Sequence, residues 1–171
     1  MNETYMASPT LAAALVSPEH WLMIGLCLVL TGTVVTLHYE ALERFNRWLP
    51  DLRLPARARV LVLIVGLLIV HTLEIWIFGG VLFGVTQWPQ LGRIGGVDEL
   101  HLLDAVYLST VTFTTVGYGD LIPLGPLRLL LGMESLSGFV LVTWSASFTY
   151  LEMQRDWHLR AGPNSSDDNT D

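Results

Sequence analysis

The segment of the chain most suited to a defined chemistry is residues 114–120, with the sequence TTVGYGD. Gly117 and Gly119 can adopt backbone conformations that residues with a Cβ atom adopt only at a cost, so successive carbonyl groups in this segment can face the same way. A ring of such carbonyl oxygens can replace the hydration shell of a cation. A Gly-Tyr-Gly triplet alone also occurs in ordinary loops, where it forms a turn.

The longer segment around this triplet, residues 104–123 (DAVYLSTVTFTTVGYGDLIP), resembles the signature sequence of the potassium channel pore-domain family. The resemblance implies a selectivity filter made by four copies of the chain, because one loop cannot surround an ion. The Thr115 hydroxyl would complete the innermost K⁺ site. The residues that would bind K⁺ in such a filter are Thr115, Val116, Gly117, Tyr118 and Gly119.

Three further residues are predicted to support this filter. Thr114 precedes it, and Asp120 follows it at the outer mouth. The hydroxyl of Tyr107 could reach Asp120 behind the filter, and we expect filter stability to depend on this contact.

Three apolar segments must position the filter, because a helix that crosses a bilayer needs about 20 mostly uncharged residues. They cover residues 21–38, 60–85 and 124–152. The shorter apolar stretch before the filter, residues 99–114, is predicted to be a pore helix that begins near Asp98 or Glu99. The predicted fold is an all-α membrane protein with three transmembrane helices. A re-entrant pore helix and filter lie between the second and third helices, and the chain assembles as a tetramer.

The distribution of arginine predicts how the chain is oriented, since short cytoplasmic loops are rich in basic residues. Residues 39–59 contain five arginines, whereas residues 1–20 contain no Lys or Arg. The N-terminus is therefore expected outside and the C-terminus in the cytoplasm of a multi-pass protein of the cell membrane. Residues 86–98 would then form an extracellular turret, and residues 153–171 a disordered cytoplasmic tail.

The basic linker contains an amphipathic segment over residues 40–49, with apolar side chains at helical spacing and Glu/Arg pairs on its polar side. One interpretation is a separate helix that lies in the cytoplasmic interface of the membrane. The alternative is a cytosolic continuation of the first span. In either case Pro50 is expected to end the helix.

The third span contains candidates for gating. By resemblance to simple two-helix and bacterial inward-rectifier-like potassium channels, Gly138 falls where a hinge glycine would lie, although a mid-helix glycine also serves close helix packing. Tyr150 could narrow the intracellular entrance, or it could anchor the helix in lipid together with Trp144. The residues expected to line a central cavity are Phe139, Val142, Thr143, Ala146 and Tyr150.

Ionisable side chains within the spans need partners, because a charge in the bilayer is costly. His71 and Glu74 share one face of the second span, and Glu134 is expected at a similar depth in the third. One hypothesis is a pH-sensing cluster in which carboxyl groups lie close together. The alternative is a structural hydrogen-bond network that braces the pore helix.

Composition excludes several classes of function. The net charge of −7 comes without a cluster of Lys or Arg, so no nucleic-acid surface is expected. No arrangement of nucleophile and base, metal-ligand spacing or phosphate-binding loop indicates an enzyme, and no cofactor is expected besides K⁺ as the transported ion. The expected partners are three further copies of the chain and the lipid bilayer. Alternatives are a non-conducting accessory or regulatory membrane subunit, a poorly selective cation channel, and a subunit of a potassium-uptake transporter.

Overall fold

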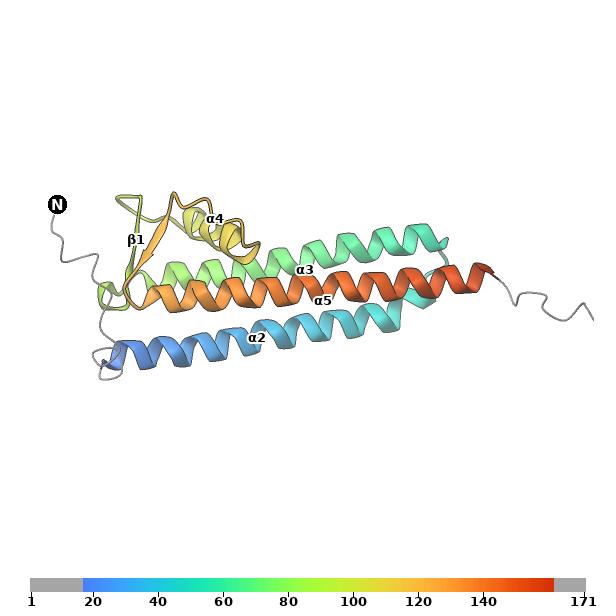
Figure 1. The fold of residues 1–171 in the computed structure, drawn as a ribbon, viewed down its shortest axis with the longest axis horizontal. Helices are drawn as coiled ribbons and strands as arrows, with labels where there is room; N and C mark the ends of the chain where they lie inside the picture. The colour runs from blue at the N-terminus through green and yellow to red at the C-terminus, as the bar shows by residue number, and fades with distance from the viewer. Residues whose placement is uncertain (1–16, 162–171) are drawn as a thin grey trace, which may run out of the picture.

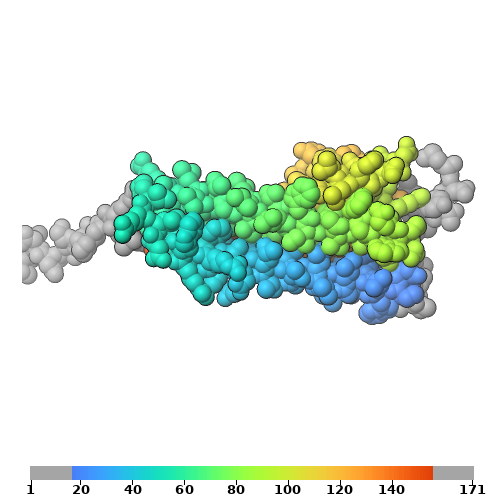
Figure 2. Space-filling view, turned by 180° about the vertical axis from the view of Figure 1, so that it is seen from behind, coloured from blue at the N-terminus to red at the C-terminus, as the bar shows by residue number. Residues whose placement is uncertain are grey.

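Three long helices run side by side and form most of the molecule (Figure 1). The computed structural model describes residues 17–161. Helix α2 spans Pro18–Trp48, α3 spans Ala56–Val85 and α5 spans Leu127–Ala161. All three are long and apolar enough to cross a membrane, which confirms the predicted number of spanning helices. Seen from behind, α2 and α3 lie along each other over the length of the molecule (Figure 2).

Helix α2 is one continuous helix that includes the amphipathic segment. Pro18 occupies its first turn, where the fixed φ of proline suits a helix start. It ends at Trp48 and passes into a short 3-10 helix, η2 (Leu49–Asp51), which contains Pro50. Arg47 pairs with Glu43 at 2.7 Å on the exposed side. The segment from residue 40 to Trp48 is therefore a continuation of the first span and not a separate helix.

The ends of the other helices differ from the predicted limits. Helix α3 begins four residues before residue 60, directly after Pro55, which is its N-cap. Helix α5 begins three residues after residue 124 and continues to Ala161. The disorder predicted from residue 153 is therefore wrong for residues 153–161. Residues 1–16 of the predicted N-terminal segment 1–20 and residues 162–171 of the predicted tail lie outside the described residues.

A short helix, α4 (Leu102–Phe113), lies at one end of the molecule on α3 and α5, on the side away from α2 (Figure 1). It is shorter than the predicted helix over residues 99–114. Its N-cap is His101, and not Asp98 or Glu99, because the carboxylate of Asp104 in the first turn accepts a hydrogen bond from the His101 amide at 3.0 Å.

A small sheet joins the chain before α4 to the chain before α5. Strand β1 (Arg93–Gly95) pairs antiparallel with β2 (Ile122–Leu124). Arg93 lies opposite Leu124, and a 3-10 helix, η3 (Pro89–Leu91), precedes β1. The elements η3 and β1 lie within the turret predicted over residues 86–98, and β2 occupies residue 124, where the third span was predicted to start.

Two glycines allow α4 to approach its neighbours closely. A Cβ atom at Gly79 of α3 would lie 2.8 Å from the Cα atom of Val106, which is closer than side chains pack. A Cβ atom at Gly138 of α5 would lie 2.8 Å from the carbonyl carbon of Phe113. The absence of side chains at these two positions therefore sets the depth at which α4 sits between α3 and α5.

Candidate functional site

The backbone of the predicted filter alternates between two conformations. Thr115, Gly117 and Gly119 have φ angles of 60°, 51° and 80°, whereas Val116 and Tyr118 do not have positive φ. A β-branched residue with positive φ is a genuine outlier, and such strain is concentrated at functional positions. Alternation of positive and negative φ turns successive carbonyl groups to one side of the chain and successive amides to the other.

Amides of this segment are bonded back to α4. The Thr115 amide donates to the carbonyl of Thr112 at 2.9 Å, and the Gly117 amide donates to the carbonyl of Val111 at 3.0 Å. The Val116 and Tyr118 side chains are 54% and 71% exposed in the single chain. The segment is therefore anchored to α4 on one side, while the large side chains of Val116 and Tyr118 are left uncovered.

Tyr107 lies in hydrogen-bond contact with the end of the segment. Its hydroxyl donates to the Asp120 carboxylate at 2.9 Å, which is the contact predicted from the sequence. The hydrogen bond to this carboxylate raises the pKa of Tyr107. Thr114, the third predicted support residue, donates its hydroxyl to the carbonyl of Thr110 at 2.7 Å and so caps the end of α4. The Tyr107–Asp120 hydrogen bond ties α4 to the residue that follows the filter.

Comparison with known proteins identifies the class to which this fold and this segment belong. The family model described as "Ion channel" matches residues 59–154. The chain therefore belongs to this family, the pore-domain family of potassium channels, and is a membrane protein. Membership of this family favours ion transport over catalysis.

One similar protein is "Potassium channel K1" of Plasmodium berghei (strain Anka). The two sequences are 29% identical over 107 residues, which are 63% of this chain and 4% of the relative. The chain thus spans only a small part of that protein's length. No solved structure matches the chain.

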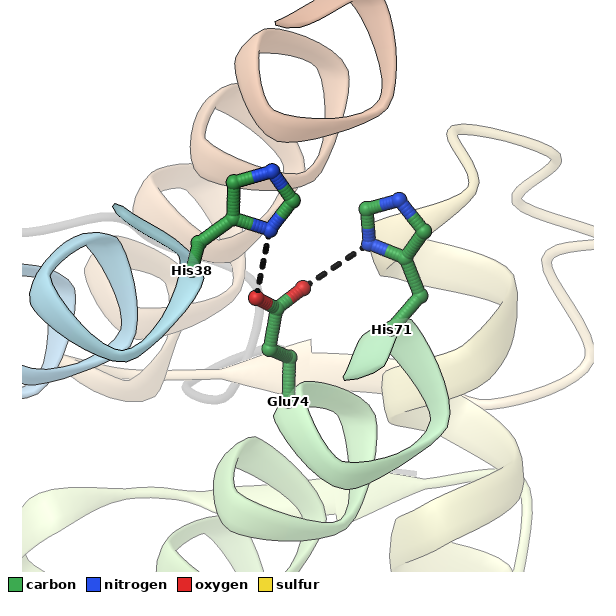
Figure 3. Close-up of side chains that lie close together, drawn as sticks. All are labelled: His38, His71 and Glu74. Carbon is green, nitrogen blue, oxygen red and sulfur yellow. Dashed lines mark hydrogen bonds and ion pairs between the residues drawn. The ribbon is translucent and has the colours of Figure 1, made fainter. Parts of the chain in front are cut away.

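A buried polar cluster joins the three long helices. Glu74 of α3 uses both carboxylate oxygens: one lies 2.9 Å from Nδ1 of His38 in α2, and the other lies 2.8 Å from Nδ1 of His71 (Figure 3). On the far side of both imidazoles, the Ser145 hydroxyl of α5 lies 3.2 Å from Nε2 of His38 and 3.1 Å from Nε2 of His71. His38 and Glu74 are completely buried.

Glu134 does not belong to this cluster, contrary to the predicted grouping of His71, Glu74 and Glu134. Its carboxyl is hydrogen bonded to the hydroxyl of Ser109 in α4, which also bonds to the carbonyl of Ile75 at 2.9 Å. Among the described residues, each of the two carboxyls hydrogen bonds to other groups and not to the other carboxyl. Through Ser109, the Glu134 carboxyl of α5 is tied to α4 and to the backbone of α3, which is the kind of network that the structural alternative describes.

Sequence reasoning missed His38, although it is the last residue of the first predicted span. The contacts of His38 depend on which face of α2 meets α3. Apolar periodicity alone does not show how α2 packs against the other helices. The signal that could have found it is that His38 is the one side chain among His, Asp, Glu, Lys and Arg in that span.

The gating candidates of α5 fall into two groups. The helix continues through Gly138, where the backbone of Phe113 makes the close contact that the packing alternative predicts. Trp144 lies against α2, with its ring centroid 5.6 Å from His38 and 6.3 Å from Tyr39, so it is an internal contact as well as a partly exposed side chain. Although they are not the only exposed residues of α5, the residues predicted to line a cavity are all exposed in the single chain: Phe139, Val142, Thr143, Ala146 and Tyr150.

Proposed function

We propose that the chain is one subunit of a potassium-selective channel that conducts K⁺ passively through a fourfold filter of backbone carbonyls. The observation that carries the proposal is the alternation of positive and negative φ from Thr115 to Gly119. Such a backbone presents a row of oxygens on one side, and four copies around an axis enclose successive rings of oxygen. The positive φ of Thr115 costs conformational free energy that an ordinary loop would avoid.

The other elements take their roles from this arrangement. Helix α4 is the re-entrant pore helix, and the partial negative charge at its C-terminal end favours a cation beyond Phe113. Helices α3 and α5 are the outer and inner helices of a pore domain over residues 60–152, and three further copies cover the exposed filter. The exposed face of α5 lines the cavity, with K⁺ as the only transported ion and no cofactor.

Selectivity for K⁺ is supported by the intact TTVGYGD sequence and by the relative whose name is that of a potassium channel. The orientation follows from the arginine-rich segment between α2 and α3. We place the N-terminus outside the cell membrane and the C-terminus in the cytoplasm.

The test is cation flux into liposomes that contain the purified protein, with K⁺ compared with Na⁺ and with Ba²⁺ as a blocker. Gly117→Ala is the informative variant: its φ is 51° and nothing lies within 4 Å of an added Cβ, so the change acts through backbone conformation and not through a clash in the single chain. Gly132→Ala in α5, which also has nothing within 4 Å, is the matched control.

The expected result is K⁺ flux that exceeds Na⁺ flux, is blocked by Ba²⁺, is lost in Gly117→Ala and is retained in Gly132→Ala. Equal Na⁺ flux would reject selectivity and support a poorly selective cation channel. No flux from a folded tetramer would support a non-conducting accessory subunit.

A further inference from the structure

The cluster of His38, His71, Glu74 and Ser145 forms a closed ring of four contacts, each between 2.8 and 3.2 Å. The two imidazole rings are stacked, with their centroids 5.2 Å apart. Both Nδ1 atoms face the Glu74 carboxylate, and both Nε2 atoms face the Ser145 hydroxyl. The filter and its supports use none of these four side chains.

A count of hydrogens shows that this ring is incomplete by itself. Each of the four contacts needs one hydrogen between its two atoms. A neutral histidine supplies one, the serine hydroxyl supplies one, and a carboxylate supplies none. Two neutral histidines with Ser145 and Glu74 therefore provide three hydrogens for four contacts, and one contact is left with two lone pairs facing each other. An added cation removes this conflict.

We propose that His38, His71 and Glu74 bind a divalent transition metal, with Zn²⁺ as the best fit. Two imidazole nitrogens and one carboxylate are a ligand set that suits Zn²⁺ and its neighbours in the first transition row. One potential ligand atom from each of the three residues lies within 4.8 Å of the other two. The metal takes the lone pairs of both Nδ1 atoms and one carboxylate oxygen.

Ser145 completes the site as a second-layer partner. When a metal occupies Nδ1, a neutral imidazole carries its hydrogen on Nε2, so the hydrogen moves from one ring nitrogen to the other and none is released. The Ser145 oxygen has two lone pairs and lies 3.2 Å and 3.1 Å from the two Nε2 atoms, so it can accept both hydrogen bonds. Such partners fix the tautomer and orientation of metal-bound histidines.

A metal at this site would link α2 to α3, because His38 lies in α2 whereas His71 and Glu74 lie in α3. Zn²⁺ holds its ligands at about 2.0–2.2 Å, which places them roughly 3.3 Å from one another in tetrahedral geometry. The three candidate ligand atoms lie within 4.8 Å of one another, so small side-chain movements are enough to reach this spacing. The His71 side chain is 14% exposed in the single chain, so the cluster is not completely closed to solvent. His38 lies outside residues 59–154, which match the family, whereas His71, Glu74 and Ser145 lie inside them, so the complete site requires α2.

The test uses Co²⁺, whose visible absorption reports tetrahedral coordination, titrated into the purified full-length protein in detergent. The variants are His38→Gln, His71→Gln, Glu74→Gln and Ser145→Ala. The matched control is His101→Gln: His101 is another histidine with a carboxylate nearby, Asp104 at 3.5 Å, but it is exposed. Elution at the wild-type volume on gel filtration shows which variants are folded.

We expect one Co²⁺ per chain, displaced by Zn²⁺, with affinity at least 100-fold weaker in any folded His38→Gln, His71→Gln or Glu74→Gln variant. Ser145→Ala should weaken binding by about 10- to 100-fold, and His101→Gln should leave it unchanged. Absence of the tetrahedral Co²⁺ bands in the wild-type protein would overturn the proposal and indicate that a proton alone completes the ring. Equal binding by all folded variants would overturn it as well.

Discussion

The backbone of Phe113 rests directly on Gly138. An added Cβ at Gly138 would lie 2.8 Å from the carbonyl carbon of Phe113 and 2.9 Å from its Cα. Phe113 is the last residue of α4, and the filter segment begins two residues later. The surface of α5 at Gly138 therefore sets where the filter begins.

Gly138→Ala should destabilise the protein by about 1–3 kcal/mol, since backbone atoms cannot move aside as a side chain can. The measurement is the free energy of unfolding in mixed detergent micelles. Gly132→Ala, on the same helix with nothing within 4 Å, is the control and should be neutral or slightly stabilising. If Gly138 acts only as a hinge, its alanine variant will change channel opening and leave the free energy of unfolding unaffected.

The adjacent glycines of α3 offer a matched pair. Gly79 faces the backbone of Val106, whereas an added Cβ at Gly80 has nothing within 4 Å. Gly79→Ala should therefore lower the free energy of unfolding by about 1–3 kcal/mol. Gly80→Ala should not lower it, because alanine is the better helix former. Equal thermal midpoints for the two variants would contradict the packing of α4 on α3 described above.

Tyr107→Phe removes the hydrogen bond to Asp120 and should speed the loss of K⁺ current during sustained activity, because the outer end of the filter is then less constrained. Single-channel or macroscopic recording checks this, with Tyr39→Phe on α2 as control. The bond raises the pKa of Tyr107, so its contribution is complete below the ordinary tyrosine pKa of about 10 and is lost as pH rises through the raised value. Wild-type current should therefore not change between pH 6 and 8 through this group. Unaltered inactivation in the variant would refute the role of the contact.

Glu134→Gln should preserve the stability of the protein, whereas Glu134→Ala should lower it. Ser109 has one hydrogen but contacts both the Glu134 carboxyl and the Ile75 carbonyl. Both contacts are complete when residue 134 donates, which a glutamine amide can do. Alanine leaves a buried hydroxyl without this partner, and we expect a loss of about 1–3 kcal/mol in the free energy of unfolding. Equal stability of the two variants, measured by denaturation, would show that the Ser109 contact contributes nothing.

The parts of the fold that depend on local sequence could be predicted. Apolar length gave the three spans and the short helix before the filter, because the bilayer thickness fixes that length. The contact of Tyr107 with Asp120 could also be predicted, since Tyr107 lies in the short helix and Asp120 lies at the end of the loop that directly follows it. The predicted helix limits were less accurate. The start of α4 depends on a single hydrogen bond from the His101 amide to Asp104, and the sequence offers other acidic residues nearby that could start the helix instead.

The parts that depend on tertiary packing could not. The polar groups around Glu74 come from three helices, and the sequence contains no rule for which face of α2 meets α3. The pairing of β1 with β2 was missed because three-residue strands lack a recognisable alternation. For Gly138, spacing favoured a hinge and close packing about equally, and only the position of Phe113 shows the contact.

The pairing of β1 with β2 has a mechanical consequence. It fastens the chain that enters α4 to the chain that leaves the filter, so residues 96–121 form a loop closed at its base. When the start of α5 shifts, both ends of this loop are carried in the same direction. In the proposed tetramer, a tilt of α5 would therefore move this loop as a unit and change its distance from the loops of the other subunits, while the spacing of oxygens within the loop would stay constant.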